Sequence, residues 1–204
     1  MTKSMWVMWP KEKDQKYKVV GTTTRILQLI DEKKLNFDTS VSEQVSEFCH
    51  PEVTVGHLLL HTSGLQGDFE RKGELKDKED RGMVCGVAHD SKAYLLGESG
   101  SAGIFSTLSD LMSFVEAYLQ RDGRLFSEGM FRTILDTTFK DRGLGWNKEY
   151  GNHILYHTGF TGTSILMDMD TREGMILLTN RIHPSRDNKV FLEERIALNH
   201  LWLD

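Results

Sequence analysis

Near its C-terminal end the chain reads His157-Thr158-Gly159-Phe160-Thr161-Gly162-Thr163-Ser164-Ile165-Leu166-Met167-Asp168. A turn of small residues here leads into a mostly apolar run, a pattern that predicts a turn followed by a β-strand. The two glycines let the backbone pass close to a ligand, and an exposed strand edge can bind an extended peptide-like group. His157 could supply a proton donor or a cation. The alternative is a glycine–threonine turn that binds nothing.

The segments around this stretch predict an antiparallel sheet. Strands are expected near residues 144–146, 154–157, 164–169 and 175–179. The last two flank a polar hairpin loop at 170–174.

Helices are predicted before and after these strands. From residue 18 to about 34, apolar residues recur at intervals of three and four. Thr54 is a suitable N-cap for a short second helix, which Gly64 would end in the left-handed conformation. Further helix starts are expected at Thr107 (a capping box with Asp110), at Ser127 and at Asn188. Helices, then antiparallel strands, then a closing helix indicate an α+β fold with N-terminal and C-terminal helices packed on the sheet.

Length and composition suggest a single globular domain. We expect an irregular N-terminal segment at 1–17, with a short strand at 5–9, followed by a domain at 18–204 that contains a polar loop at 66–82. The net charge is −5 and charges of both signs are interspersed, so no basic face predicts nucleic-acid binding. No signal peptide or transmembrane run is apparent, which predicts a cytoplasmic protein without a membrane partner.

Two chemical motifs are incomplete. His57 and His61 have the spacing of zinc-protease ligands, but residues 58–60 are all leucine and provide no glutamate base. Residues 97–101 approach a nucleophile elbow without meeting its Gly-x-Ser-x-Gly pattern, and we interpret them as a tight turn. We therefore expect neither a metal nor another cofactor.

Several blocks together resemble one family. Residues 54–65, ending in His61-Thr62-Ser63-Gly64-Leu65, resemble the His-Thr-Ser-Gly-Leu block of serine β-lactamase-like proteins. These are the class C β-lactamases, D-alanyl-D-alanine carboxypeptidases and related esterases. Further blocks follow in the family's order at 86–90, 101–110, 157–159 and 177–184. The resemblance covers residue 18 to the end and implies a reduced β-lactamase/transpeptidase-like fold and acyl transfer through a serine ester.

The resemblance also implies site residues. Lys18 falls where the family has the lysine of its Ser-x-x-Lys motif, and His157 heads the strand that binds the substrate. Both are therefore expected as catalytic residues. Thr158, Gly159 and Phe160 are expected to bind the substrate, with the Phe160 N–H in the oxyanion hole.

Two parts of the family's machinery are missing. Gln15 stands at the nucleophile position three residues before Lys18, and the Tyr-x-Asn block of the proton relay is absent from the loop at 66–82. Glutamine is not a nucleophile, and Ser63 is expected to cap a turn, so hydrolysis is expected to be impaired.

Three functions remain open. The interpretation we favour is a protein of the serine hydrolase family with little or no hydrolytic activity. The others are a non-catalytic module that binds a small or peptide-like acyl ligand along the His157 strand, and a truncated or internally deleted gene product. Exposed sheet edges also predict self-association.

Overall fold

The computed structural model describes residues 15–16, 19–65, 86–90, 93–94, 100–184 and 188–204. Lys18, the loop at 66–82, the strand at 5–9 and most of the 97–101 turn lie outside these residues. The described elements are β1 (Gln15–Lys16), α1 (Val19–Asp31), α2 (Val41–Gln44), α3 (Val55–Leu59), β2 (Phe105–Ser106), α5 (Leu108–Gln120), α6 (Glu128–Asp136), β3 (Ile154–Thr158), β4 (Ser164–Asp168), β5 (Glu173–Leu177) and α7 (Val190–Leu203).

Strands β3, β4 and β5 form an antiparallel sheet in that order. His157 lies opposite Ile165, and Asp168 lies opposite Glu173 across the hairpin. Strand β5 begins two residues earlier than predicted, because Glu173 and Gly174 pair with β4 instead of lying in the loop. The α+β prediction is confirmed. Three elements were not predicted: strands β1 and β2, which pair with each other, and helix α2.

The predicted strand at 144–146 is wrong. Gly145 has a φ of +78°, outside the β region, and its N–H donates to the Leu59 carbonyl at 2.9 Å. A side chain at position 145 would also collide with Thr23, since a Cβ there would lie 2.2 Å from Thr23 Cγ2. The chain therefore turns away from the sheet toward α3 and α1 instead of extending along β3.

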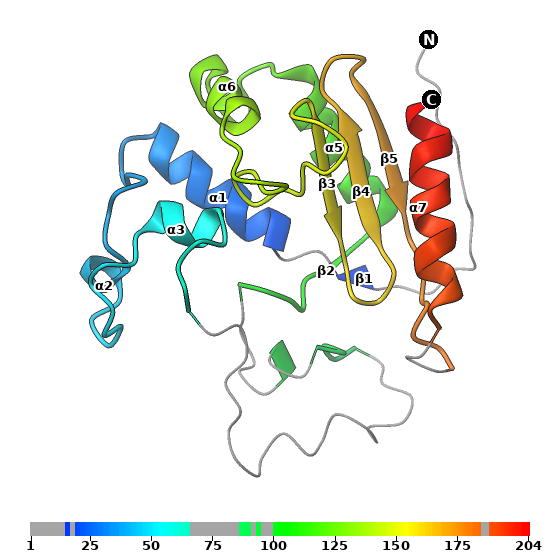
Figure 1. The fold of residues 1–204 in the computed structure, drawn as a ribbon, viewed down its shortest axis with the longest axis horizontal. Helices are drawn as coiled ribbons and strands as arrows, with labels where there is room; N and C mark the ends of the chain where they lie inside the picture. Colours follow the sequence, from blue (N-terminus) through cyan, green and yellow to red (C-terminus); the bar gives the residue numbers. More distant parts are fainter. Residues whose placement is uncertain (1–14, 17–18, 66–85, 91–92, 95–99, 185–187) are drawn as a thin grey trace.

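Helices cover both faces of the sheet (Figure 1). The face toward α1, α5 and α6 carries three fully buried side chains, those of Leu155, Ile165 and Met167. The opposite face carries side chains that pack against α7, namely Ile154, Tyr156, Leu166 and Met175. N-terminal and C-terminal helices thus pack on the sheet as predicted, and α5 also contacts β4 and β5 directly. None of the described helices is long and apolar enough to cross a membrane.

Side-chain caps begin three of the helices at the predicted residues, but the capping box forms between Thr54 and His57, and at Thr107 the Asp110 N–H bond is the cap. The hydroxyls of Thr54, Thr107 and Ser127 each accept a hydrogen bond from the backbone N–H three residues on. The prediction for the end of α3 needs correction. The helix ends at Leu59 with Leu60 as its C-cap, and the next residue, His61, takes up the left-handed conformation with a φ of +57°. Gly64 also has a positive φ but lies beyond the helix.

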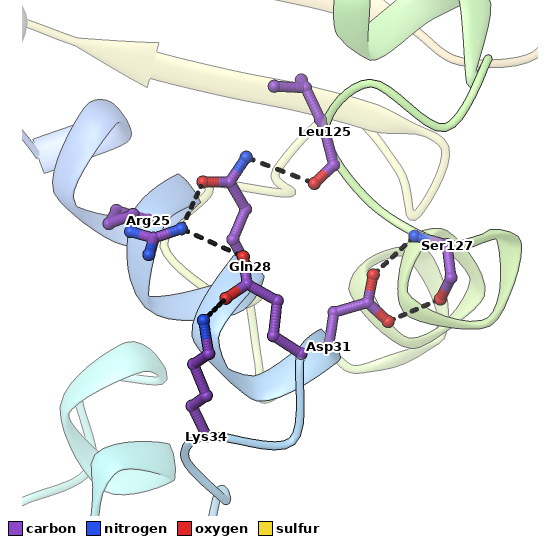
Figure 2. Close-up of polar contacts among 7 residues, drawn as sticks. Arg25, Gln28, Asp31, Lys34, Leu125 and Ser127 are labelled. Carbon is purple, nitrogen blue, oxygen red and sulfur yellow. Dashed lines mark hydrogen bonds and ion pairs between the residues drawn. The ribbon is translucent and has the colours of Figure 1, made fainter.

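Polar contacts fix the C-terminal half of α1 against the segment that leads into α6 (Figure 2). The Asp31 carboxylate accepts hydrogen bonds from both the N–H and the hydroxyl of Ser127, at 2.5 Å each. Gln28 Nε2 donates to the Leu125 carbonyl at 3.3 Å. These bonds hold α1 in place beside the turn at Gly145.

Candidate functional site

The hydrogen-bond pattern of β3 determines which of its backbone groups are available to bind a further strand or a ligand. Gly159 N–H donates to the Thr163 carbonyl at 2.7 Å, and Met169 N–H donates to the His153 carbonyl at 3.0 Å. In an antiparallel pair, residues that bond to the partner strand alternate with residues that do not. The odd-numbered residues of β3 therefore bond to β4, and the even-numbered residues present their N–H and C=O groups to the opposite side.

Asn147 occupies one position on that outer side. It exchanges two backbone hydrogen bonds with Tyr156, at 2.8 and 3.1 Å. The next outward-facing residue is Thr158. Continued antiparallel pairing would place Gly145 opposite it, but Gly145 turns away toward Leu59. Within the described ranges, no backbone group pairs with the outward N–H and C=O of Thr158, which form an open edge.

A tight turn follows this edge. The Gly162 N–H donates to the Gly159 carbonyl at 3.0 Å. Gly162 has a φ of +102°, and a Cβ there would lie 2.2 Å from Thr179 Oγ1, so the position requires glycine. The turn exposes Phe160, whose surface is 59% accessible.

His157 is half-buried and packs in a T-shaped arrangement with the Trp146 ring, with ring centroids 6.4 Å apart. Burial lowers its pKa from 6.5 to about 4, and electrostatic interactions with Arg142 and His61 act in the same direction. The imidazole is therefore neutral at pH 7. In this state it carries one N–H donor and one acceptor nitrogen, and it supplies no cation.

Acid should destabilise the fold through His157. Between about pH 6.5 and pH 4 the unfolded chain binds a proton at this residue that the folded chain does not, so stability falls as the pH is lowered through this window. The loss attributable to His157 should reach about 3 kcal/mol. Urea unfolding at several pH values checks this. His157→Gln should reduce the change in the free energy of unfolding between these pH values, whereas His153→Gln, at an exposed histidine, should not. If the stability of His157→Gln fell with pH as much as that of the unsubstituted protein, His157 would not be the group responsible.

The predicted substrate-binding residues lie together. Thr158, Gly159 and Phe160 continue directly from His157 at the end of β3. Lys18 lies outside the described residues, so its position relative to His157 stays a prediction. The backbone of Gln15 pairs with Ser106 in the β1–β2 ladder, which places the expected nucleophile position in a short strand.

The residues around His157 come from distant segments, and sequence patterns gave no sign of them. Trp146 and Arg142 belong to the connection before β3, and His61 follows α3. A single sequence contains no signal that brings these three residues to one imidazole.

The other sequence candidates have structural roles. His57 Nδ1 accepts the Thr54 N–H at 3.2 Å and completes a capping box. The Ser63 hydroxyl accepts the Leu65 N–H at 3.4 Å, as expected for a turn cap.

One group with metal-ligand chemistry was not predicted. The potential ligand atoms of His153, Asp168 and Asp170 lie within 4.8 Å of one another at the far end of β3. Asp168 Oδ1 already accepts hydrogen bonds from the N–H groups of Asp170 and Thr171 in the hairpin. We therefore interpret the three side chains as part of the turn.

Comparison with known proteins places this arrangement in context. The sequence profile of the beta-lactamase family matches residues 70–198, a range that begins after Lys18. A protein of Escherichia coli O157:H7, provisionally named a D-alanyl-D-alanine carboxypeptidase, is 29% identical over 119 residues, which are 48% of this chain and 27% of that protein. An N-acetylmuramyl-L-alanine amidase of Bacillus subtilis is 32% identical over 121 residues, again 48% of this chain and 27% of the relative.

The matches thus span only a minor part of these relatives' own lengths. Penicillin-binding protein 4 of Amycolatopsis lactamdurans is 41% identical over 56 residues, 24% of this chain and 15% of that protein. Among solved structures, a beta-lactamase from Mycobacterium bovis superimposes with a TM-score of 0.57 at 18% identity, covering 92% of this chain and 87% of that one. At this identity the likeness shows the fold.

Proposed function

Because this chain belongs to the beta-lactamase family, we propose that it is a serine-hydrolase-related protein that binds a peptide-like acyl ligand along β3 without forming a serine ester. The open edge at Thr158 is the observation that carries this proposal. One N–H and one C=O there face the same side, which matches the C=O and N–H of an amide in an extended ligand. The ligand would continue the sheet where Gly145 leaves it.

Two neighbouring groups favour the same ligand class. The neutral His157 can donate one hydrogen bond without the cost of burying a charge. The Phe160 N–H at the start of the turn can donate to an acyl oxygen placed beyond Thr158. Alanine-containing amides appear in the names of two relatives, a D-alanyl-D-alanine carboxypeptidase and an N-acetylmuramyl-L-alanine amidase. N-acetyl-D-alanyl-D-alanine is therefore a suitable probe.

The proposed loss of hydrolysis rests on residue chemistry. Gln15 has an amide where the family's motif has a serine hydroxyl, and an amide nitrogen does not attack a carbonyl. Without that hydroxyl, binding does not lead to a covalent intermediate. Lys18 and His157, the two catalytic residues that the resemblance implies, would then lack the nucleophile on which they act.

Binding is tested by titrating ¹⁵N-labelled protein with N-acetyl-D-alanyl-D-alanine and following the amide resonances of Thr158 and Phe160. We expect saturable shifts at both. Thr158→Pro removes an outward N–H that β4 does not use, so it should raise the Kd at least tenfold while the sheet resonances persist. His157→Ala should weaken binding as well, and His153→Ala, four residues earlier, serves as the matched control.

Two results would contradict the proposal. An absence of saturable shifts in folded protein would favour a gene product without ligand-binding function. An unchanged Kd in a folded Thr158→Pro variant would show that the ligand binds elsewhere. The same edge would also mediate the proposed self-association, which would appear as concentration-dependent shifts of Thr158 without ligand.

A further inference from the structure

Arg181 makes three contacts with two consecutive residues of the turn after β3. Its backbone N–H donates to the Thr161 carbonyl at 3.0 Å, and its Nε donates to the Phe160 carbonyl at 2.9 Å. Its guanidinium carbon lies 4.8 Å from the centre of the Phe160 ring. On the same ring, His89 stacks at a centroid distance of 6.0 Å and 10° from parallel. A weaker bond of 3.4 Å joins Arg181 Nη1 to the Asn188 carbonyl, just before α7.

These contacts fix the peptide planes on the C-terminal side of Phe160. The carbonyls of Phe160 and Thr161 are both held by Arg181, and the Gly159 and Gly162 N–H groups close the turn from within. The Phe160 N–H shares its peptide plane with the Gly159 carbonyl, which accepts the Gly162 N–H. The Gly162 N–H in turn shares its plane with the Thr161 carbonyl, so the planes that Arg181 holds are linked to the plane of the Phe160 N–H.

We infer that Arg181 is a positioning residue for ligand binding, one that holds the Phe160 N–H toward the open edge at Thr158. The inference rests on the proposed function, because it assigns a role at the same site. A turn that is already ordered costs less conformational entropy when the ligand binds. The planar guanidinium donates in its plane and stacks on an aromatic face, a combination that a lysine ammonium cannot reproduce.

Substitutions of Arg181 in the full chain test this role. The Kd for N-acetyl-D-alanyl-D-alanine should rise at least tenfold in Arg181→Ala and at least threefold in Arg181→Lys, which retains the positive charge. Arg132→Ala, at an exposed arginine of α6 paired with Glu128, should leave the Kd unchanged. In the ligand-free spectra, the amide resonances of Phe160 and Thr161 should move in both Arg181 variants, while that of Leu155 should stay in place.

A positioning role and a merely structural role predict different results. If Arg181 only stabilises the fold, Arg181→Ala should lower the Tm and shift resonances throughout the sheet, which would overturn the inference. An unchanged Kd or an unmoved Phe160 resonance in folded protein would also overturn it. If Arg181→Ala does not fold, the Kd and the Phe160 resonance of Arg181→Lys are judged in the same way. If the unsubstituted protein does not bind N-acetyl-D-alanyl-D-alanine, the proposed function is wrong, and so is the role of Arg181 in ligand binding. The ligand-free Phe160 resonance then still reports whether Arg181 orients the turn.

Discussion

Replacing Trp146 with alanine should lower the free energy of unfolding by about 3–5 kcal/mol. The side chain is 1% exposed and belongs to the larger core between the sheet and helices α1, α5 and α6. Its ring packs in a T-shaped arrangement with the Tyr118 ring, with centroids 5.4 Å apart, so its removal leaves a cavity among close-packed aromatic groups. Urea denaturation followed by circular dichroism measures the loss.

The same substitution should also change the pKa of His157. Trp146 contributes to the burial of His157, and burial is the main cause of the lowered pKa of that imidazole. In Trp146→Ala the pKa of His157 should therefore rise from about 4 toward 6.5, as followed by NMR titration. Phe139→Ala is the control, because Phe139 is 49% exposed and its loss should cost less than about 1 kcal/mol. A loss below about 1.5 kcal/mol in Trp146→Ala would contradict the packing described here.

Gly162→Ala should reduce binding of N-acetyl-D-alanyl-D-alanine at least tenfold. The new Cβ would lie 2.2 Å from Thr179 Oγ1 and 3.1 Å from Arg181 Cβ, on a backbone whose φ of +102° already disfavours side chains. The turn must move to relieve this contact, and the Phe160 N–H moves with it. Isothermal titration calorimetry against the unsubstituted protein measures the effect.

Two variants separate steric collision from backbone strain. Gly123 has a φ of +87°, but a Cβ added there would meet no atom within 4 Å, so Gly123→Ala should cost some stability and leave binding unchanged. Adding Thr179→Ala to Gly162→Ala removes the closest atom and should restore part of the affinity. Equal binding by Gly162→Ala and the unsubstituted protein would show that the turn does not determine ligand affinity.

Much of the fold follows from local patterns. The N-caps Thr54, Thr107 and Ser127 are confirmed because each depends only on residues within the next turn of helix. The three main strands and the hairpin between β4 and β5 likewise follow from short apolar runs and polar loops. The strand expected at 144–146 failed because Gly145 is set by its contact with Thr23, which lies far away in the sequence.

The site was predictable only in part, for the same reason. His157 to Phe160 form a contiguous motif, so the sequence brings them together without help from the fold. The open edge at Thr158 depends on Gly145 turning away, and the neutral state of His157 depends on Trp146, Arg142 and His61. Such long-range contacts leave no periodic signal in one sequence.

The proposed absence of serine-ester chemistry is tested most directly by intact-mass spectrometry. The folded full chain is incubated with a reactive β-lactam and, in a separate sample, with a fluorophosphonate. The account predicts an unchanged mass in both, because we propose that glutamine, at Gln15, stands where the family's motif has its serine nucleophile. A mass increase equal to one acyl or phosphonyl group would contradict it, and peptide mapping would then identify the nucleophile.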